Sequence, residues 1–149
     1  MPIGLCLKSV IHNFSFLTFI YILLYYMSSM KENKVYIIQE IPGTKEGRPK
    51  INIMGAKEYG EFVFLLPELS QIIFSPGPII FKLRQLLKNY TDKDYLLLTG
   101  DPAIIGVACS VVSDITGGKY NVLKWDKQER KYYPIKINLY EKGKIDESN

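Results

Sequence analysis

Apolar residues recur along the chain in short runs that predict alternating strands and helices from about residue 34 onward. Residues 35–39, 62–66 and 95–99 are rich in β-branched, aromatic or leucine side chains, as expected of strands. The run at 62–66 is continuously apolar between a charged residue and a proline, which favours a strand covered on both faces. Residues 51–54 and 71–74 are weaker strand candidates.

The spacing after residue 74 predicts a first helix. Ser75 is a suitable N-cap, and Pro76 and Pro78 are tolerated in a helix only within its first turn. Apolar residues then recur with helical spacing over residues 79–90, and the polar stretch Thr91–Asp94 ends the helix.

The segment YLLLTGDPAIIGVACSVVSDITGG predicts a strand, a tight turn and a second helix. A buried strand ends at Thr99, Gly100 permits the turn, and Asp101 is an N-cap. Pro102 takes the first helical position, where its missing N–H has no cost, and Gly117–Gly118 end the helix through the left-handed region. The apolar stripe of this helix comprises Ile104, Val107, Ala108, Val111 and Ile115.

Two further strands are predicted at residues 121–125 and 133–139, joined by the charged loop 126–131 as a hairpin. Pro134 near the start of the last strand indicates an edge position. Together these elements predict an α/β fold: a small, mostly parallel sheet with two main helices and a C-terminal antiparallel β-hairpin. This single domain spans residues 31–140 and is followed by a polar tail, residues 141–149.

Residues 1–30 are an apolar leader whose central run, residues 14–27, reads FSFLTFIYILLYYM. Three interpretations stay open: a membrane anchor, a cleaved signal peptide and a misplaced translation start. Against the anchor, the run is shorter than the roughly 20 residues of a membrane-spanning helix. The length fits the apolar region of a signal peptide better, but no small-residue cleavage site follows it. Met27 and Met30 are plausible translation starts, so the leader also fits a misplaced start in AT-rich coding. If the run is a membrane anchor, the lysines that follow it favour a cytoplasmic domain.

Composition narrows the function classes. Apolar residues make up 47% of the chain and charged residues 23%, which is ordinary for a globular protein. The net charge is +4, too even to indicate nucleic-acid binding by itself. The single histidine, His12, lies in the leader, so the domain has no imidazole base or ligand.

The two cysteines, Cys6 and Cys109, lie in unlike settings that do not favour a disulfide between them. This indicates the reducing cytoplasm. Cys109 is expected to be buried and inert.

The chain lacks the phosphate-loop, dinucleotide, nucleophile-elbow, zinc-protease and paired-cysteine motifs. What remains is the strand-to-helix turn Thr99–Gly100–Asp101, because ligands of open α/β sheets bind at such positions. One hypothesis is a cofactor-binding site at Thr99, Gly100 and Asp101 for a nucleotide, phosphate or other anion. The negative charge of Asp101 would then require a bridging cation such as Mg²⁺ or a ribose hydroxyl. The other interpretation is that Asp101 only caps the helix.

The hairpin segment KWDKQERKYY mixes basic and aromatic residues. Such a mixture can stack bases and neutralise phosphates, although the acids within it dilute the charge, and a protein contact is equally well supported. A solvated turn is the third interpretation. The predicted partner-binding residues are Trp125, Lys127, Arg130 and Tyr132.

The sequences DYLLLTGDPAIIGVACSVVSD and VLKWDKQERKYYPIKI resemble a set of small uncharacterised proteins encoded by tailed bacteriophages. The shared pattern is DYLLL-x-GDP-x-x-IG at the helix start and KWD-x-QE-x-x-YYP-I afterwards, over roughly residues 35–139. The resemblance implies an intracellular phage accessory protein made during infection. It brings no known reaction, so no catalytic residue follows from it.

The leading hypothesis is a small, non-enzymatic binding or regulatory module in the host cytoplasm whose partner is a host or phage protein. Nucleic acid is a weaker partner candidate, and a membrane is a partner only if the leader is translated and retained. The alternative is a nucleotide- or phosphate-binding domain, dependent on Mg²⁺ or not, centred on Thr99, Gly100 and Asp101. No catalytic or metal-ligating residue is assigned, and no cofactor is identified.

Overall fold

The computed structural model describes residues 16–25, 32–43 and 52–143. The chain divides into two units, Met1–Glu32 and Asn33–Asn149. In the first unit, residues 16–25 form a helix. None of the helices among the described residues is both long enough and apolar enough to cross a membrane. The ends of the predicted apolar run lie outside the described residues, and the three interpretations of the leader stay predictions.

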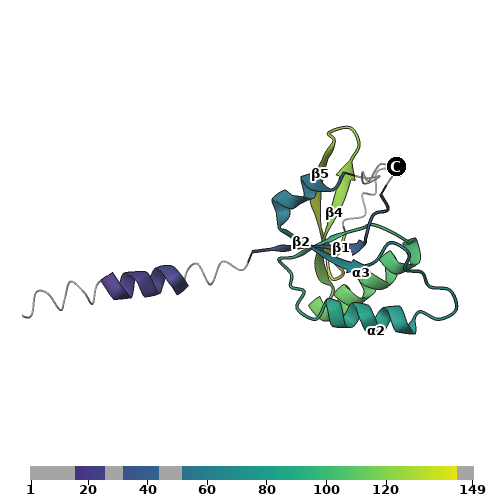
Figure 1. Ribbon diagram of the computed structural model, residues 1–149, viewed down its shortest axis with the longest axis horizontal. Coiled ribbons are helices and arrows are strands. Elements are labelled where there is room, and N and C mark those ends of the chain that lie inside the picture. The colour runs from purple at the N-terminus through teal and green to yellow at the C-terminus, as the bar shows by residue number, and fades with distance from the viewer. Residues whose placement is uncertain (1–15, 26–31, 44–51, 144–149) are drawn as a thin grey trace, which may run out of the picture. The chain divides into compact units, whose positions relative to one another are not determined.

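The second unit is an α/β domain built on a five-stranded sheet (Figure 1). The strands lie in the order β2-β1-β3-β4-β5, and every neighbouring pair is parallel except the antiparallel pair β4–β5. The predicted fold class is therefore confirmed. The elements in chain order are β1 (Lys34–Gln39), the 3₁₀ helix η1 (Met54–Tyr59), β2 (Glu61–Leu66), α2 (Gly77–Leu86), β3 (Tyr95–Leu97), α3 (Pro102–Thr116), β4 (Lys119–Asp126) and β5 (Lys131–Asn138).

The strand order explains why α2 and α3 share one face of the sheet. The connection from β1 to β2 crosses the sheet in one direction, and those from β2 to β3 and from β3 to β4 cross it in the other. Right-handed crossovers place such connections on opposite faces. Accordingly, Leu83 of α2 and Ile104 of α3 are buried with Ile38 of β1 on one face, whereas η1 covers Val35 and Ile37 on the other (Figure 1).

Local sequence signals determine where α3 begins and ends. The carboxylate of Asp101 accepts hydrogen bonds from the backbone N–H groups of Ala103 and Ile104. Gly117 and Gly118 have φ values of 63° and 81°, and the N–H of Gly118 closes the helix by donating to the carbonyl of Ser113 at 2.7 Å. Both ends agree with the prediction, because capping chemistry depends on neighbours along the chain.

Three strand predictions need correction. Residues 71–74 form no strand and pair with none of the strands of the sheet, and Phe74 is 98% exposed. Met54 begins η1 instead of ending a strand, while Ile51 lies outside the described residues. β2 forms as predicted, but it is an edge strand with Phe64 half-exposed, so it is not covered on both faces.

A buried hydrogen-bond network joins β1, β3 and β4 at the amino ends of the strands. The carboxylate of Asp94, just before β3, accepts bonds from the N–H of Lys34 at 2.9 Å and from the N–H and hydroxyl of Thr91 at 2.8 and 2.9 Å. The amide of Asn121 in β4 donates to the carbonyls of Asp92 and Asp94. Because all of these groups are hydrogen-bonded, burial of Asp94 and Asn121 costs little.

Replacement of Asp94 tests this network. We expect Asp94→Asn to lower the free energy of unfolding by about 2–3 kcal/mol, because an amide N–H₂ cannot accept the bonds that Thr91 donates. The matched control is Asp92→Asn, whose exposed side chain lies two residues away and whose effect should stay within about 0.5 kcal/mol. Urea denaturation at pH 7 measures both, and equal stabilities of the two variants would contradict the role of Asp94.

Candidate functional site

The carboxyl ends of β1 and β3 lie side by side where the direction of the chain across the sheet reverses. In open α/β sheets, ligands bind in the crevice at this point. Gln39 ends β1 here, and Thr99, Gly100 and Asp101 follow β3. The structure therefore places the predicted cofactor-binding residues at the end of the sheet where the prediction requires them.

The side chain of Gln39 occupies this crevice and is 3% exposed. Its Nε2 lies 3.2, 2.6 and 2.9 Å from the carbonyl oxygens of Pro67, Glu68 and Ser70, and its Oε1 accepts the N–H of Asp101 at 2.8 Å. Because an amide nitrogen carries two hydrogens, at least one of them is shared among the three carbonyls. Gln39 therefore ties the loop after β2 to the turn after β3.

Thr99 and Gly100 are fitted to Gln39. The hydroxyl of Thr99 donates to the carbonyl of Gln39 at 2.8 Å and accepts the N–H of Gln39 at 3.4 Å. Gly100 has a φ of 106°, and a Cβ at this position would lie 2.1 Å from Gln39 Oε1. Glycine is thus required here both by the backbone conformation and by the close approach of a side chain.

Two of the residues that the ligand hypothesis names, Thr99 and Asp101, already use their side chains in hydrogen bonds within the protein. Asp101 Oδ1 accepts the N–H groups of Ala103 at 2.7 Å and Ile104 at 3.3 Å, and Pro102 has no N–H. The first turn of α3 therefore offers few free donors to a phosphate. Helix capping by Asp101 is observed, and ligand binding at Thr99, Gly100 and Asp101 stays a prediction.

A neighbouring cavity of about 450 Å³ brings together residues from both predicted sites. It lies beside the carboxyl ends of β3 and β4 and includes Thr99 from one site and Trp125 and Tyr132 from the other. Gly100, Asp101, Lys127 and Arg130 do not line it. Its remaining lining residues, which the sequence did not single out, are Asn52, Leu97, Leu98 and Leu123.

Trp125 is held at the mouth of this cavity by Tyr132. The two residues are paired across β4 and β5, with ring centroids 4.9 Å apart. Tyr132 is 3% exposed, and its hydroxyl donates to the carbonyl of Asn52 at 3.2 Å. Burial raises the pKa of Tyr132 above its ordinary value, so the phenol stays protonated at neutral pH. Trp125 itself remains 41% exposed, so Trp125 is accessible to a partner and Tyr132 supports it.

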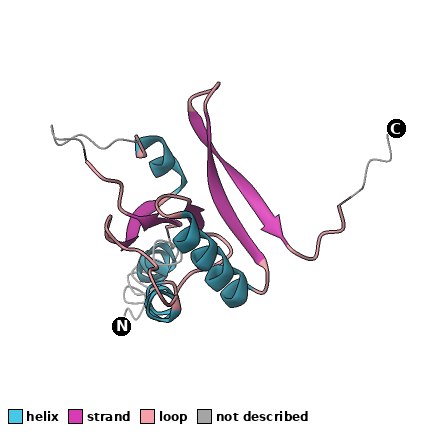
Figure 2. Cartoon of the chain, turned by 90° about the vertical axis from the view of Figure 1, so that its right-hand side faces the viewer, coloured by secondary structure: helices cyan, strands magenta, loops and turns pink. Residues whose placement is uncertain are grey.

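The β4–β5 hairpin extends beyond the other strands and ends in a tight turn (Figure 2). Asp126 Oδ1 accepts the N–H groups of Gln128 at 2.8 Å and Glu129 at 3.1 Å, and the hydrogen bonds from Glu129 and Gln128 lower the pKa of Asp126. Arg130 has a φ of 52°, the left-handed conformation that most residues avoid. Lys127 and Arg130 are both exposed at this turn.

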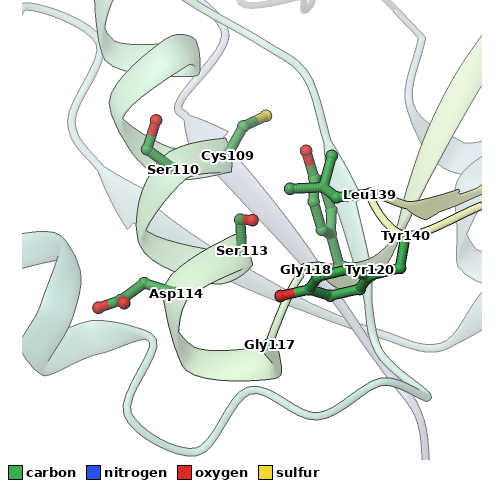
Figure 3. Close-up of a pocket in the computed structure, with 9 residues that line it drawn as sticks. All are labelled: Cys109, Ser110, Ser113, Asp114, Gly117, Gly118, Tyr120, Leu139 and Tyr140. Atoms are coloured by element: carbon green, nitrogen blue, oxygen red, sulfur yellow. The ribbon is translucent and has the colours of Figure 1, made fainter.

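A second cavity of about 530 Å³ lies between the C-terminal half of α3 and the residues flanking β4 and β5 (Figure 3). Cys109 and Ser113 face Tyr120 there, whereas Asp114 points away from it and pairs with Arg84 at 2.8 Å. Cys109 is half-buried, which corrects the prediction that this residue is buried. Burial raises the pKa of Cys109, and a hydrogen bond with Tyr120 partly opposes this rise.

The cavity beside α3 offers little for chemistry. A thiol with a raised pKa stays protonated at neutral pH and is a poor nucleophile. The part of the chain that the structure describes contains no group of three or more His, Cys, Asp or Glu that could hold a metal ion. The aromatic cavity at the carboxyl ends of β3 and β4 and the adjoining hairpin turn are therefore the stronger candidate site.

Comparison with known proteins identifies a family for the domain. A family model described as Phage Pam3 gp32-like protein matches residues 33–139, which include the strands β1 to β5 and the helices η1, α2 and α3. Neither the curated proteins nor the solved structures give a significant match.

The contact between Gly100 and Gln39 generates a test. We expect Gly100→Ala to destabilise the domain by about 2–4 kcal/mol, because alanine disfavours this backbone conformation and its Cβ would clash with Gln39. Gly106→Ala is the matched control: it lies inside α3 with nothing within 4 Å of the added Cβ, so it should stabilise the domain by about 0.5–1 kcal/mol. Thermal and urea denaturation measure both, and a Gly100→Ala variant as stable as the wild type would show that Gln39 does not fill the crevice.

Proposed function

The chain belongs to the Phage Pam3 gp32-like protein family, and we propose that it acts as a small, non-enzymatic binding module whose contact surface is the β4–β5 hairpin. This surface comprises Trp125, Lys127 and Arg130, with Tyr132 beneath Trp125. The observation that carries the proposal is the half-exposed Trp125, fixed by a buried tyrosine at the mouth of an apolar cavity and flanked by exposed cations.

The charge of the hairpin favours an acidic partner. Residues 119–138 contain six lysines and arginines but only two acids, Asp126 and Glu129. The Asp126 carboxylate is engaged by the backbone of the turn, and Glu129 lies 3.5 Å from the ammonium of Lys131. Lys127 and Arg130, by contrast, are exposed, and both are close to Trp125 in the sequence.

The shape and lining of the surface favour a protein segment over a nucleic acid. One exposed indole beside a cavity lined by leucines suits a single apolar side chain of a partner. Binding of single strands commonly uses several stacking rings along a basic groove, whereas Tyr132 here is buried beneath Trp125. An acidic protein segment with an apolar anchor residue is therefore the partner class that we propose.

The conformation of Arg130 is a further indication of function. A left-handed conformation costs a non-glycine residue about 1 kcal/mol, and glycine or asparagine would relieve this cost. An arginine at this position is costly for folding, and its exposed guanidinium makes no ion pair within the described residues. A role in recognition would account for it.

The alternative, a nucleotide or phosphate site at Thr99, Gly100 and Asp101, has weaker support. Its location at the carboxyl ends of the strands is favourable. However, the side chain of Gln39 fills the crevice, and Asp101 occupies the helix N-terminus with a negative charge. The binding-module hypothesis uses Trp125, Lys127 and Arg130, which face solvent, whereas the side chains of Thr99 and Asp101 already have hydrogen-bond partners.

The test uses two substitutions that preserve the fold. Arg130→Gly removes the cation and relieves the left-handed conformation, and Trp125→Ala removes an exposed ring above Tyr132. We expect each variant to fold and to capture its phage or host protein from infected cells at least about tenfold more weakly, as for a hot-spot residue. Lys82→Ala, an exposed lysine on α2, is the control and should capture normally.

Capture by both hairpin variants at the level of the wild type would rule out this surface. If nuclease treatment abolishes capture, the partner is a nucleic acid and the proposed protein partner is wrong. Denaturation curves of the variants, measured alongside, separate lost binding from lost folding.

A further inference from the structure

The two edges of the sheet differ sharply in their protection against pairing with another strand. β5 carries Pro134, Lys131 and Lys136, and proline and lysine are residues by which natural edges avoid further pairing. β2 reads EFVFLL, with one charge at its first residue and neither lysine nor proline within it. Among the described residues its only strand partner is β1.

We propose that β2 pairs antiparallel with β2 of a second copy of this chain, so that the two five-stranded sheets form one continuous sheet about a twofold axis. This interface is separate from the hairpin surface, which belongs to the opposite edge of the sheet. A homodimer of this kind presents the same patch twice, so the strand must be complementary to itself.

The sequence of β2 satisfies that requirement. Phe62 and Phe64 align with Val35 and Ile37 of β1 and so share the face that η1 covers. If the two copies pair about Val63, Phe62 of each copy lies opposite Phe64 of the other, and aromatic cross-strand pairs stabilise antiparallel sheets. Each Glu61 then lies opposite Leu65, so the two carboxylates lie at opposite ends of the paired segment and do not repel each other.

Exposed apolar side chains also follow β2 in the chain. Leu69, Ile73 and Phe74 are all exposed, and Phe74 is 98% exposed. Ile73 and Phe74 belong to residues 71–74, which the sequence pattern predicted to be a strand and which form no strand in the single chain.

Sedimentation velocity of the full chain at micromolar concentrations tests the proposal. We expect the wild type to be a dimer and Phe64→Lys to weaken dimerisation at least tenfold, because the lysine would replace one ring of each Phe62–Phe64 cross-strand pair with a charge. Leu139→Lys is the matched control: Leu139 is exposed and directly follows β5, at the opposite edge of the sheet, so its replacement should leave the dimer intact. Denaturation curves verify that both variants fold.

Hydrogen exchange provides a second readout that does not depend on the variants. In the wild type, exchange in the peptide covering residues 61–66 should slow as concentration rises, whereas in Phe64→Lys it should not change. A wild type that is monomeric at these concentrations would overturn the proposal. A dimer that persists in Phe64→Lys, with no concentration-dependent protection of β2, would overturn it equally, because association would then proceed through another part of the chain.

Discussion

Hydrogen bonds of buried polar side chains at the two ends of β1 and β3 hold this small sheet together. Within the described residues, the buried polar side chains are Gln39 and Thr99 at the carboxyl ends and Asp94 and Asn121 at the amino ends. β3 has only three residues, so its backbone hydrogen bonds to the neighbouring strands are few and do little to fix its position in the sheet. The Gln39 amide and the Asp94 carboxylate fix the position of β3 by binding the backbone at its two ends.

This arrangement has a consequence for function. The crevice at which α/β sheets usually bind ligands is filled by Gln39, and Gly100 is shaped to accept that side chain. The features that face solvent lie instead at the two edges of the sheet: the half-exposed Trp125 with its cations at the β4–β5 hairpin, and the unprotected strand β2. These observations are the basis of our proposal that the domain contacts other macromolecules and does not act on a small molecule.

Local signals in the sequence predicted most of the elements, because capping and turn chemistry act between near neighbours. Asp101–Pro102 and Gly117–Gly118 delimit α3 as expected, and Pro134 lies on an edge strand. The parts that could not be predicted depend on distant partners. Gln39 binds residues 28 and 62 positions away, and Tyr132 is bonded to a carbonyl 80 positions away, so no local pattern predicts these contacts. Residues 71–74 have the composition of a strand, but a strand also requires a neighbour with which to pair.

The most direct measurement is the free energy of unfolding of Gln39→Leu by urea denaturation. The leucine side chain is similar in size to that of glutamine but is apolar, so it leaves the N–H of Asp101 and the carbonyls after β2 without their partner. We expect a loss of about 2–3 kcal/mol. A variant as stable as the wild type, within about 0.5 kcal/mol, would show that the Gln39 amide does not hold the two loops together.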